Sequence, residues 1–353
     1  MREIRHVSDY LELICSRSNR IGEMIEKEEK EQRKNINRIN ELEKRDSNNL
    51  LDETTLNKSE DWLIDQIEEN SDSVYSYFHY QERNRLFQSS NALSPVCFYR
   101  GISDVSYDIV PGIYRTNERH GENYYFNEIS VRCPSVFRTL DNLEKLAYMQ
   151  HYGCPTRLLD ITSNPLVALY FACNQHINKN GCVHIFSVMP REVLYANSDR
   201  VLMLAKMAEF DVDQQEQLRR QAMISLFRGN FLKNTNKKYK PSIVEQYYSA
   251  VKRSNFAFER EIKPLDLLTP RFIQPHKDNP RILKQDGAFI IAGLCKDEWE
   301  CNAKIRKYVD ESIMIRGEQK KEIIRELDIV GINLASLFPE VDKVADYLKY
   351  KEE

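Results

Sequence analysis

The chain has 353 residues, of which 41% are hydrophobic and 30% are charged, and its formal net charge is −3. This length can hold one large domain with an extension, or two domains. The slightly acidic balance argues against non-specific binding to a nucleic-acid backbone, which favours an excess of Lys and Arg, and no apolar run reaches the ~18 residues of a membrane span.

Cysteine usage indicates a reducing compartment. The chain has eight cysteines. They form no CxxC pair and no cluster with zinc-finger spacing, so we expect reduced and mostly buried thiols. The first residues show no apolar stretch before a small-residue cleavage site, so no secretory signal is expected. We therefore predict a cytoplasmic protein.

The first 90 residues are predicted to form a helical N-terminal region. Apolar residues give a partial helical stripe at Ile21, Met24, Ile25, Ile36, Ile39 and Leu42. The stripe is interrupted by the charged run EKEEKEQRKN, so a sustained coiled coil is not expected. We interpret this part as two helices or one long polar helix, packed on the main body or on a partner. Ser59 is predicted to cap the next helix, and residues 73–88 to continue as helix.

From Leu93 onward, short apolar runs alternate with turns. Strands are predicted at residues 95–102, 181–189 and 286–294. Helices are predicted at residues 127–138, 141–153, 164–176 and across most of 201–233, with Asn164 as a cap and Pro165 at the first helical position. The tail, residues 302–350, is predicted to add a short strand and helices. Interspersed strands and helices favour an α+β fold for residues 91–353, with a mixed sheet and surrounding helices.

Three polar segments stand at the edges of these elements. In the first, Arg100 precedes Gly101 and could present its guanidinium to a carboxylate or phosphate, or pair with a buried Asp. In the second, residues 150–164, His151 could act as a general acid or base or serve as a hydrogen-bonded structural residue. Arg157 and Asp160 in that segment are close enough to form a bridge that holds a turn and helix cap.

The third segment, residues 279–289, places Gln285 and Asp286 just before an apolar strand. Gly287 there lets the backbone approach a neighbour closely, although an ordinary turn into a strand would look the same. Three such sets, separated by long connections, are typical of a composite site. If they form one, Arg100, Asp160 and Gln285 should line a single cavity.

Several common site classes have no support in the sequence. GxxxxGK[ST] and GxGxxG are absent, which argues against phosphate-cradle ATPases and dinucleotide-binding Rossmann folds. HExxH and GxSxG are absent too. No metal site is predicted, because His and acidic residues do not cluster at ligand spacing.

The three segments resemble the motifs of the FRG domain. Phe98-Tyr99-Arg100-Gly101 is similar to its Phe-Arg-Gly signature, and YMQHYGCPTRLLDITSNPLVALYFA (residues 148–172) to its long central motif. In the latter, Cys154 stands where an aliphatic residue is common and Ile161 where Trp is common. NPRILKQDGAFII (residues 279–291) resembles its late segment, and the tail also resembles the ending that often follows. The resemblance spans roughly residues 90–350 and implies a bacterial or phage-associated protein, often in a defence or toxin context.

The order of these residues also resembles that of ADP-ribosyltransferases. This comparison implies a catalytic set of Arg100, Thr156 and Gln285, with Ser163 as an alternative hydroxyl. Arg100 would hold a phosphate or ribose, the hydroxyl would position the nicotinamide side, and Gln285 would orient a ribose hydroxyl. Gln replaces the usual Glu at this last position. The remaining candidates, which would bind the ligand, are Tyr99, Gly101, Gln150, His151, Arg157, Asp160 and Ser163.

The leading hypothesis is an intracellular effector that uses NAD as substrate, for ADP-ribosyl transfer or NAD cleavage; no cofactor is assigned. The alternative is a non-catalytic module that senses a nucleotide or binds a protein, with the N-terminal helices transmitting the signal or mediating assembly. Expected partners are a nucleotide or small-molecule ligand, with a protein target and self-association as further options, and neither membrane nor nucleic acid. A nuclease is disfavoured because no carboxylate–metal cluster is visible.

Overall fold

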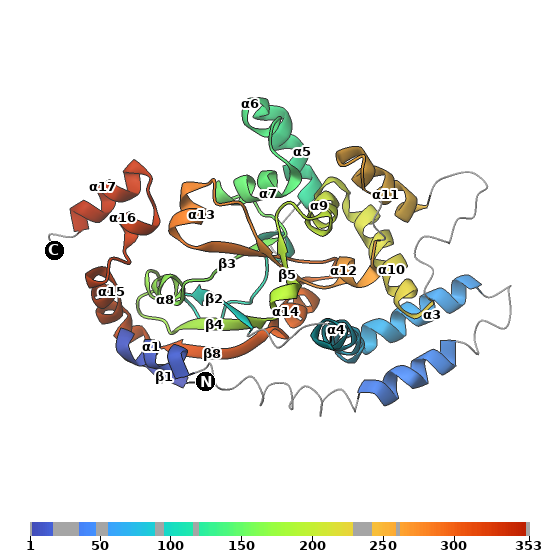
Figure 1. Cartoon of the computed structure of the whole chain (residues 1–353), viewed down its shortest axis with the longest axis horizontal. Coiled ribbons are helices and arrows are strands. Elements are labelled where there is room, and N and C mark those ends of the chain that lie inside the picture. Colours follow the sequence, from blue (N-terminus) through green and yellow to red (C-terminus); the bar gives the residue numbers. More distant parts are fainter. Residues whose placement is uncertain are drawn as a thin grey trace.

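A computed structural model describes residues 2–16, 35–46, 56–88, 95–115, 120–228, 242–258 and 262–350. Its centre is one eight-stranded sheet with helices packed around it (Figure 1). The strands are β1 (Arg2–Ile4), β2 (Val96–Ile102), β3 (Leu158–Thr162), β4 (Gly181–Val188), β5 (Val193–Tyr195), β6 (Arg271–Gln274), β7 (Gly287–Ile291) and β8 (Val309–Ile315). Two pairs are parallel and the others antiparallel, which confirms the predicted α+β class with a mixed sheet.

The strand order is β1-β8-β4-β2-β3-β7-β6-β5. β2 pairs with β4 along seven residues, and β3 pairs with β7 along five. By contrast, β2 and β3 share the single registered pair Tyr99–Thr162. The sheet therefore consists of two well-paired halves that diverge at the β2–β3 boundary, and this divergence leaves room for a pocket.

Helices cover both sides and both ends of the sheet (Figure 1). They are α1 (Val7–Cys15), α3 (Leu56–Glu69), α4 (Ser71–Gln88), α5 (Glu122–Arg132), α6 (Pro134–Phe137), α7 (Asn142–His151), α8 (Pro165–Cys173), α9 (Asp199–Lys206), α10 (Val212–Arg228), α11 (Ile243–Ser254), α12 (Pro264–Leu268), α13 (Pro280–Lys284), α14 (Glu298–Arg306), α15 (Lys320–Ile329), α16 (Leu334–Leu337) and α17 (Val341–Tyr350). Residues 35–46 are also helical.

α8 packs closely on the strand that carries Arg100. The side chain of Asn164 accepts from the backbone N–H groups of Leu166 and Val167, and Pro165 occupies the first turn, so the predicted helix start is confirmed. At Gly101, an added Cβ would lie 1.8 Å from the carbonyl oxygen of Ala168. Glycine is therefore required at this position by the close approach of helix and strand.

Within residues 2–16, 35–46 and 56–88, the N-terminal region is helical as predicted, with two differences. α3 begins at Leu56, so Ser59 lies within its first turn and is not its cap, contrary to expectation. The chain also starts with a strand, β1, which pairs with β8 and was not predicted. Of the apolar stripe, Ile39 and Leu42 are buried in the same hydrophobic cluster as residues of α3, while Ile21, Met24 and Ile25 lie outside the described residues.

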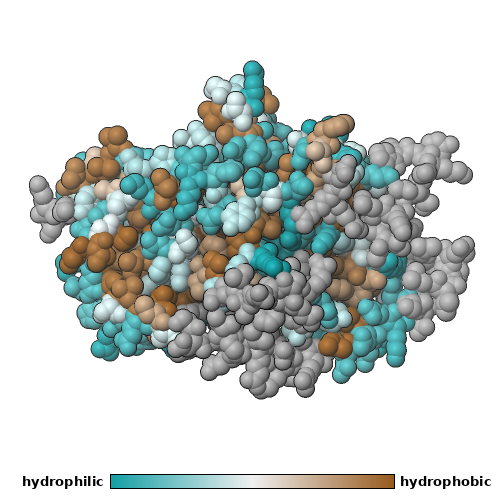
Figure 2. Space-filling model, in the orientation of Figure 1, coloured by the Kyte–Doolittle hydropathy of each residue, from teal (hydrophilic) through white to brown (hydrophobic). Residues whose placement is uncertain are grey.

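Most of the other predicted elements are confirmed, including the strands at β2, β4 and β7 and the helix α4 over residues 73–88. The end of the helix predicted across residues 201–233 lies outside the described ranges. Figure 2 shows exposed apolar side chains over α15–α17, where Ile329, Val330 and Val341 stand well into solvent. Within the described part of the chain, no helix combines the length and apolar character needed to cross a membrane.

Candidate functional site

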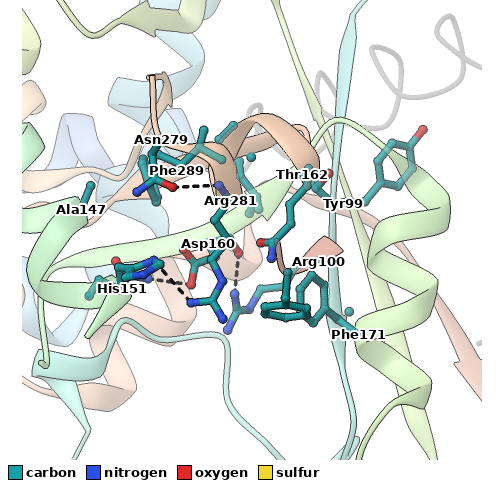
Figure 3. A pocket seen from close by; sticks show the side chains of 18 residues that line it. Tyr99, Arg100, Ala147, His151, Asp160, Thr162, Phe171, Asn279, Arg281 and Phe289 are labelled. Atoms are coloured by element: carbon teal, nitrogen blue, oxygen red, sulfur yellow. Dashed lines mark hydrogen bonds between the residues drawn. The ribbon is translucent and has the colours of Figure 1, made fainter. Parts of the chain in front are cut away.

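A pocket of about 340 Å³ opens where β2 and β3 diverge. Arg100 from β2, Asp160 from β3 and Gln285 from the end of α13 all line it, as the sequence predicted for a composite site. The lining also includes Gly101, Gln150 and His151 from the predicted set. Figure 3 shows side chains from these separate segments converging on one space.

Arg100 spans the gap between the two strands. Its Nη1 donates to the backbone carbonyl oxygen of Asp160 at 2.5 Å. Its Nε is buried and has no hydrogen-bond partner among the described residues. Burial lowers the pKa of the guanidinium, and the charge of Asp160 partly opposes this shift. Arg100 therefore keeps hydrogen-bonding capacity at the pocket.

Tyr99 is the neighbour of Arg100 in β2, but its side chain points to the other face of the sheet. Successive side chains of a strand point to opposite faces, and the ring of Tyr99 is buried in the core cluster that includes α8. Figure 3 shows this ring apart from the converging polar side chains. Tyr99 thus reaches the pocket wall without presenting its ring to the polar cluster.

Asp160 is held by a chain of two side-chain hydrogen bonds. The amide nitrogen of Gln150 donates to Asp160 Oδ2 at 2.7 Å, and the hydroxyl of Thr156 donates to the amide oxygen of Gln150 at 3.1 Å. Thr156 is 1% exposed and does not line the pocket. The hydroxyl predicted as catalytic therefore orients Gln150, which in turn orients the carboxylate.

Arg157 lies on the other side of β3. Residues separated by three positions in an extended segment face opposite sides, so the bridge between Arg157 and Asp160 is not formed. Arg157 instead donates from Nε to Glu122 at 2.5 Å, with both side chains 1% exposed. Burial opposes its charge, but the carboxylate of Glu122 raises the pKa of the guanidinium above its usual value. Arg157 lines a second cavity of about 310 Å³, away from Arg100.

Ser163 and Gln285 connect the turns on either side of the β3–β7 pair. Ser163 is exposed and its hydroxyl donates to the carbonyl of Asp286 at 3.3 Å, so it holds a turn and does not line the pocket. Gln285 ends α13, and its amide nitrogen donates to the carbonyl of Leu337 at 3.1 Å. The backbone carbonyl oxygen of Gln285 accepts a hydrogen bond from the hydroxyl of Thr162 at 2.6 Å. Gln285 thereby joins the pocket to the C-terminal segment.

Sequence reasoning did not single out Arg281, Phe171 and Phe338, which also line the pocket. The guanidinium of Arg281 lies 4.4 Å from the centre of the Phe338 ring. Its Nη1 lies 3.4 Å from His151 Nδ1 (Figure 3). Both Arg281 and Phe338 fall inside segments that carried the motif resemblance. Their role could not be seen because it depends on the tail folding over α13.

Residues 96–181 match the family model of the FRG domain. The chain contains an FRG domain. The matched segment runs from β2 to the start of β4, so it carries Arg100, Gln150 and Asp160. The FRG match ends before Arg281 and Gln285, which also line the pocket. No curated protein and no solved structure matches the chain.

The pocket therefore combines an oriented carboxylate, the two guanidinium groups of Arg100 and Arg281, and side-chain amides with aromatic rings that include Phe171 and Phe338. Such a mixture suits a ligand that has both an anionic group and a planar or sugar part. Among the described residues, no group of three or more His, Cys, Asp or Glu side chains could hold a metal ion.

Proposed function

We propose that this FRG-domain protein binds NAD in the β2–β3 pocket and cleaves the bond between nicotinamide and ribose, with water or a protein group as acceptor. The observation that supports it is the convergence of Arg100, Asp160 and Gln285 on one cavity from three distant segments. The cavity volume lies at the lower end of the range for small-molecule sites. It suits the nicotinamide-ribose-phosphate half of NAD.

The proposed roles follow from charge. As the C1′–N bond breaks, its electron pair leaves with nicotinamide, and the ribose gains the character of an oxocarbenium ion. The carboxylate of Asp160 stabilises this positive charge. In hydrolysis, water adds to C1′ and its proton passes to Asp160. Arg100 holds a phosphate, and Gln285 orients a ribose hydroxyl.

In this proposal Asp160 supplies the negative charge that stabilises the oxocarbenium ion. Gln285, which stands where ADP-ribosyltransferases usually have Glu, cannot supply that charge. Gln150 keeps one oxygen of Asp160 hydrogen-bonded, and Thr156 fixes the direction of the Gln150 amide. Thr156 is thus assigned a positioning role.

The proposed setting is the bacterial cytoplasm, where the protein would act as a toxin or antiviral defence effector. The motif resemblance supports the defence or toxin context. Burial raises the pKa of the Cys173 thiol to about 12 and that of Cys182 to about 11. Such thiols are inert, and buried free thiols fit a reducing compartment.

The test is nicotinamide release by the purified full chain supplied with NAD. Asp160→Asn should lower kcat by about 100-fold or more, because loss of one aligned electrostatic group typically has an effect of that size. Asp286→Asn is the matched control, since Asp286 lies beside the pocket without lining it. Undiminished turnover by a folded Asp160→Asn protein would remove the assignment.

A non-catalytic nucleotide sensor is the second candidate. It is favoured by one observation: Ile39 and Leu63 of the N-terminal helices share a hydrophobic cluster with Leu146 and Met149 of α7, the helix that carries Gln150 and His151. A shift of α7 on ligand binding would therefore change the packing of the N-terminal helices in this cluster. Thermal stabilisation by NAD or ADP-ribose without nicotinamide release would support this candidate over the enzyme.

A further inference from the structure

The C-terminal segment places an acidic side chain beside Arg281 and His151, two of the basic residues that line the pocket. Glu340 Oε1 lies 3.8 Å from His151 Nε2 and 3.9 Å from Arg281 Nε. These distances are too long for hydrogen bonds. Glu340 Oε2 is buried and has no partner among the described residues. The carboxylate of Glu340 therefore lies beside basic side chains without forming a hydrogen bond to either of them.

The protonation of His151 can be derived from its neighbours. Arginine donates and does not accept, so the contact of Arg281 Nη1 with His151 Nδ1 makes Nδ1 the acceptor. The proton of the neutral ring is then on Nε2, which faces Glu340. Burial and the charge of Arg281 lower the pKa of His151, against the opposing effect of Glu340. At neutral pH the pair offers a guanidinium and one N–H to an anion.

We propose that Arg281 and His151 form a phosphate subsite of the pocket, and that the carboxylate of Glu340 is a built-in occupant which a ligand phosphate displaces. The proposal rests on the proposed function only for the choice of NAD-related ligands. A phosphate has more acceptor oxygens than a carboxylate and can engage both Arg281 and His151 at hydrogen-bond distance.

The segment that carries Glu340 can yield without unfolding the core. Leu337 anchors it, being 1% exposed in the cluster around α8. Beyond Glu340, α17 packs mainly on α16, and Val341 and Leu348 at its surface are 85% and 59% exposed. Displacement of Glu340 thus needs a local rotation after Phe338, which keeps Leu337 buried and Phe338 packed on Phe171.

The proposal is tested by measuring the affinity of pyrophosphate and of ADP-ribose calorimetrically at constant ionic strength. Glu340→Gln removes the competing charge and should tighten both by about fivefold or more, the low end of a typical coupling between sites. Asp342→Asn is the matched control: it removes the same charge two residues away, where the side chain is 69% exposed. It should change affinity by less than about twofold.

Two further measurements distinguish failure of the phosphate subsite from failure of the proposed catalysis. Arg281→Gln should weaken pyrophosphate binding by about tenfold, and pyrophosphate should shift the imidazole NMR signals of His151 in the wild-type chain. If these hold while NAD is never cleaved, the subsite stands and the proposed enzyme falls. If Glu340→Gln binds both probes no more tightly than Asp342→Asn, or if neither probe binds, the subsite is overturned even where NAD is cleaved.

Discussion

Three arginines come from the segments that the motifs single out, and each has a different environment. Arg100 is half-buried and faces the pocket, where it bridges two strands. Arg281 is 26% exposed at the side chain and lies over an aromatic ring. Arg157 is enclosed with Glu122 on the opposite side of β3. The guanidinium groups of Arg100 and Arg281 are therefore placed for contact with a ligand. That of Arg157 neutralises the buried carboxylate of Glu122.

Replacing Arg157 should affect stability and leave ligand binding intact. Arg157→Met keeps much of the volume but leaves the carboxylate of Glu122 buried without its partner. Breaking a buried pair in this way costs about 3–5 kcal/mol of unfolding free energy, which urea denaturation would measure. The affinity of the folded protein for ADP-ribose should not change, because Arg157 does not line the pocket.

An exposed pair provides the control for this prediction. Arg132 and Glu128 form an ion pair whose side chains are 75% and 42% exposed. Arg132→Met should cost less than about 1 kcal/mol, since solvent screens such pairs. A stable Arg157→Met protein with weakened ADP-ribose binding would return Arg157 to the ligand site.

At the scale of elements, the contact of α8 with β2 sets the position of Arg100. Gly101→Ala would push a methyl group into the carbonyl of Ala168, so the helix must move away from the strand. Overpacking of this kind costs about 1–3 kcal/mol or more. We expect a lower thermal midpoint and, because Arg100 is the adjacent residue, weaker nucleotide binding by the folded protein.

Gly287→Ala is the comparison for that change. Gly287 also lies at the pocket, but the nearest atoms to an added Cβ there are 3.4 Å away, an ordinary contact. Its stability should change by less than about 1 kcal/mol. Equal effects of the two substitutions would mean that the α8–β2 contact is not the constraint.

Elements with local signals could be predicted, and those without could not. α8 has a capping Asn, a Pro in its first turn and a continuous apolar run, so its start is correct to the residue. β3 is short, and four of its five residues are buried, so it lacks the alternation that reveals a strand. β1 has three residues and pairs with a strand more than 300 positions away, which no local pattern indicates.

At the scale of the whole molecule, the sheet order decides which predicted residues meet. β3 lies between β2 and β7, so Asp160 is brought between Arg100 and Gln285 although the chain between them is long. The set of polar segments could be read from the sequence. The sides on which Thr156, Arg157 and Ser163 lie could not, because that depends on the register of β3 and on Glu122, 35 residues away.

Acid should destabilise the fold through His184 in β4. This residue is 3% exposed, and burial, with Arg306 and Arg100 nearby, lowers its pKa to about 4. The unfolded chain, with an ordinary pKa of about 6.5, binds the proton more tightly, so stability falls as pH drops from about 6.5 to 4. The loss is about 3 kcal/mol at most.

The pH dependence of urea unfolding in wild-type and His184→Gln proteins measures this contribution. His151 also has a lowered pKa and acts in the same direction, so the difference between the two proteins isolates His184. A slope that is identical in both proteins across this range would exclude His184 as the titrating group.

The single registered pair between β2 and β3 has a consequence for how this architecture can vary. Because Tyr99–Thr162 is the single registered backbone pair between the half-sheets, the width of the pocket mouth depends on how far β2 and β3 splay. Changes in the apolar layers beneath each half could widen or narrow the mouth of the pocket while Arg100 and Asp160 remain on its two walls. Ligand size and reaction chemistry can therefore diverge independently in proteins built on this sheet.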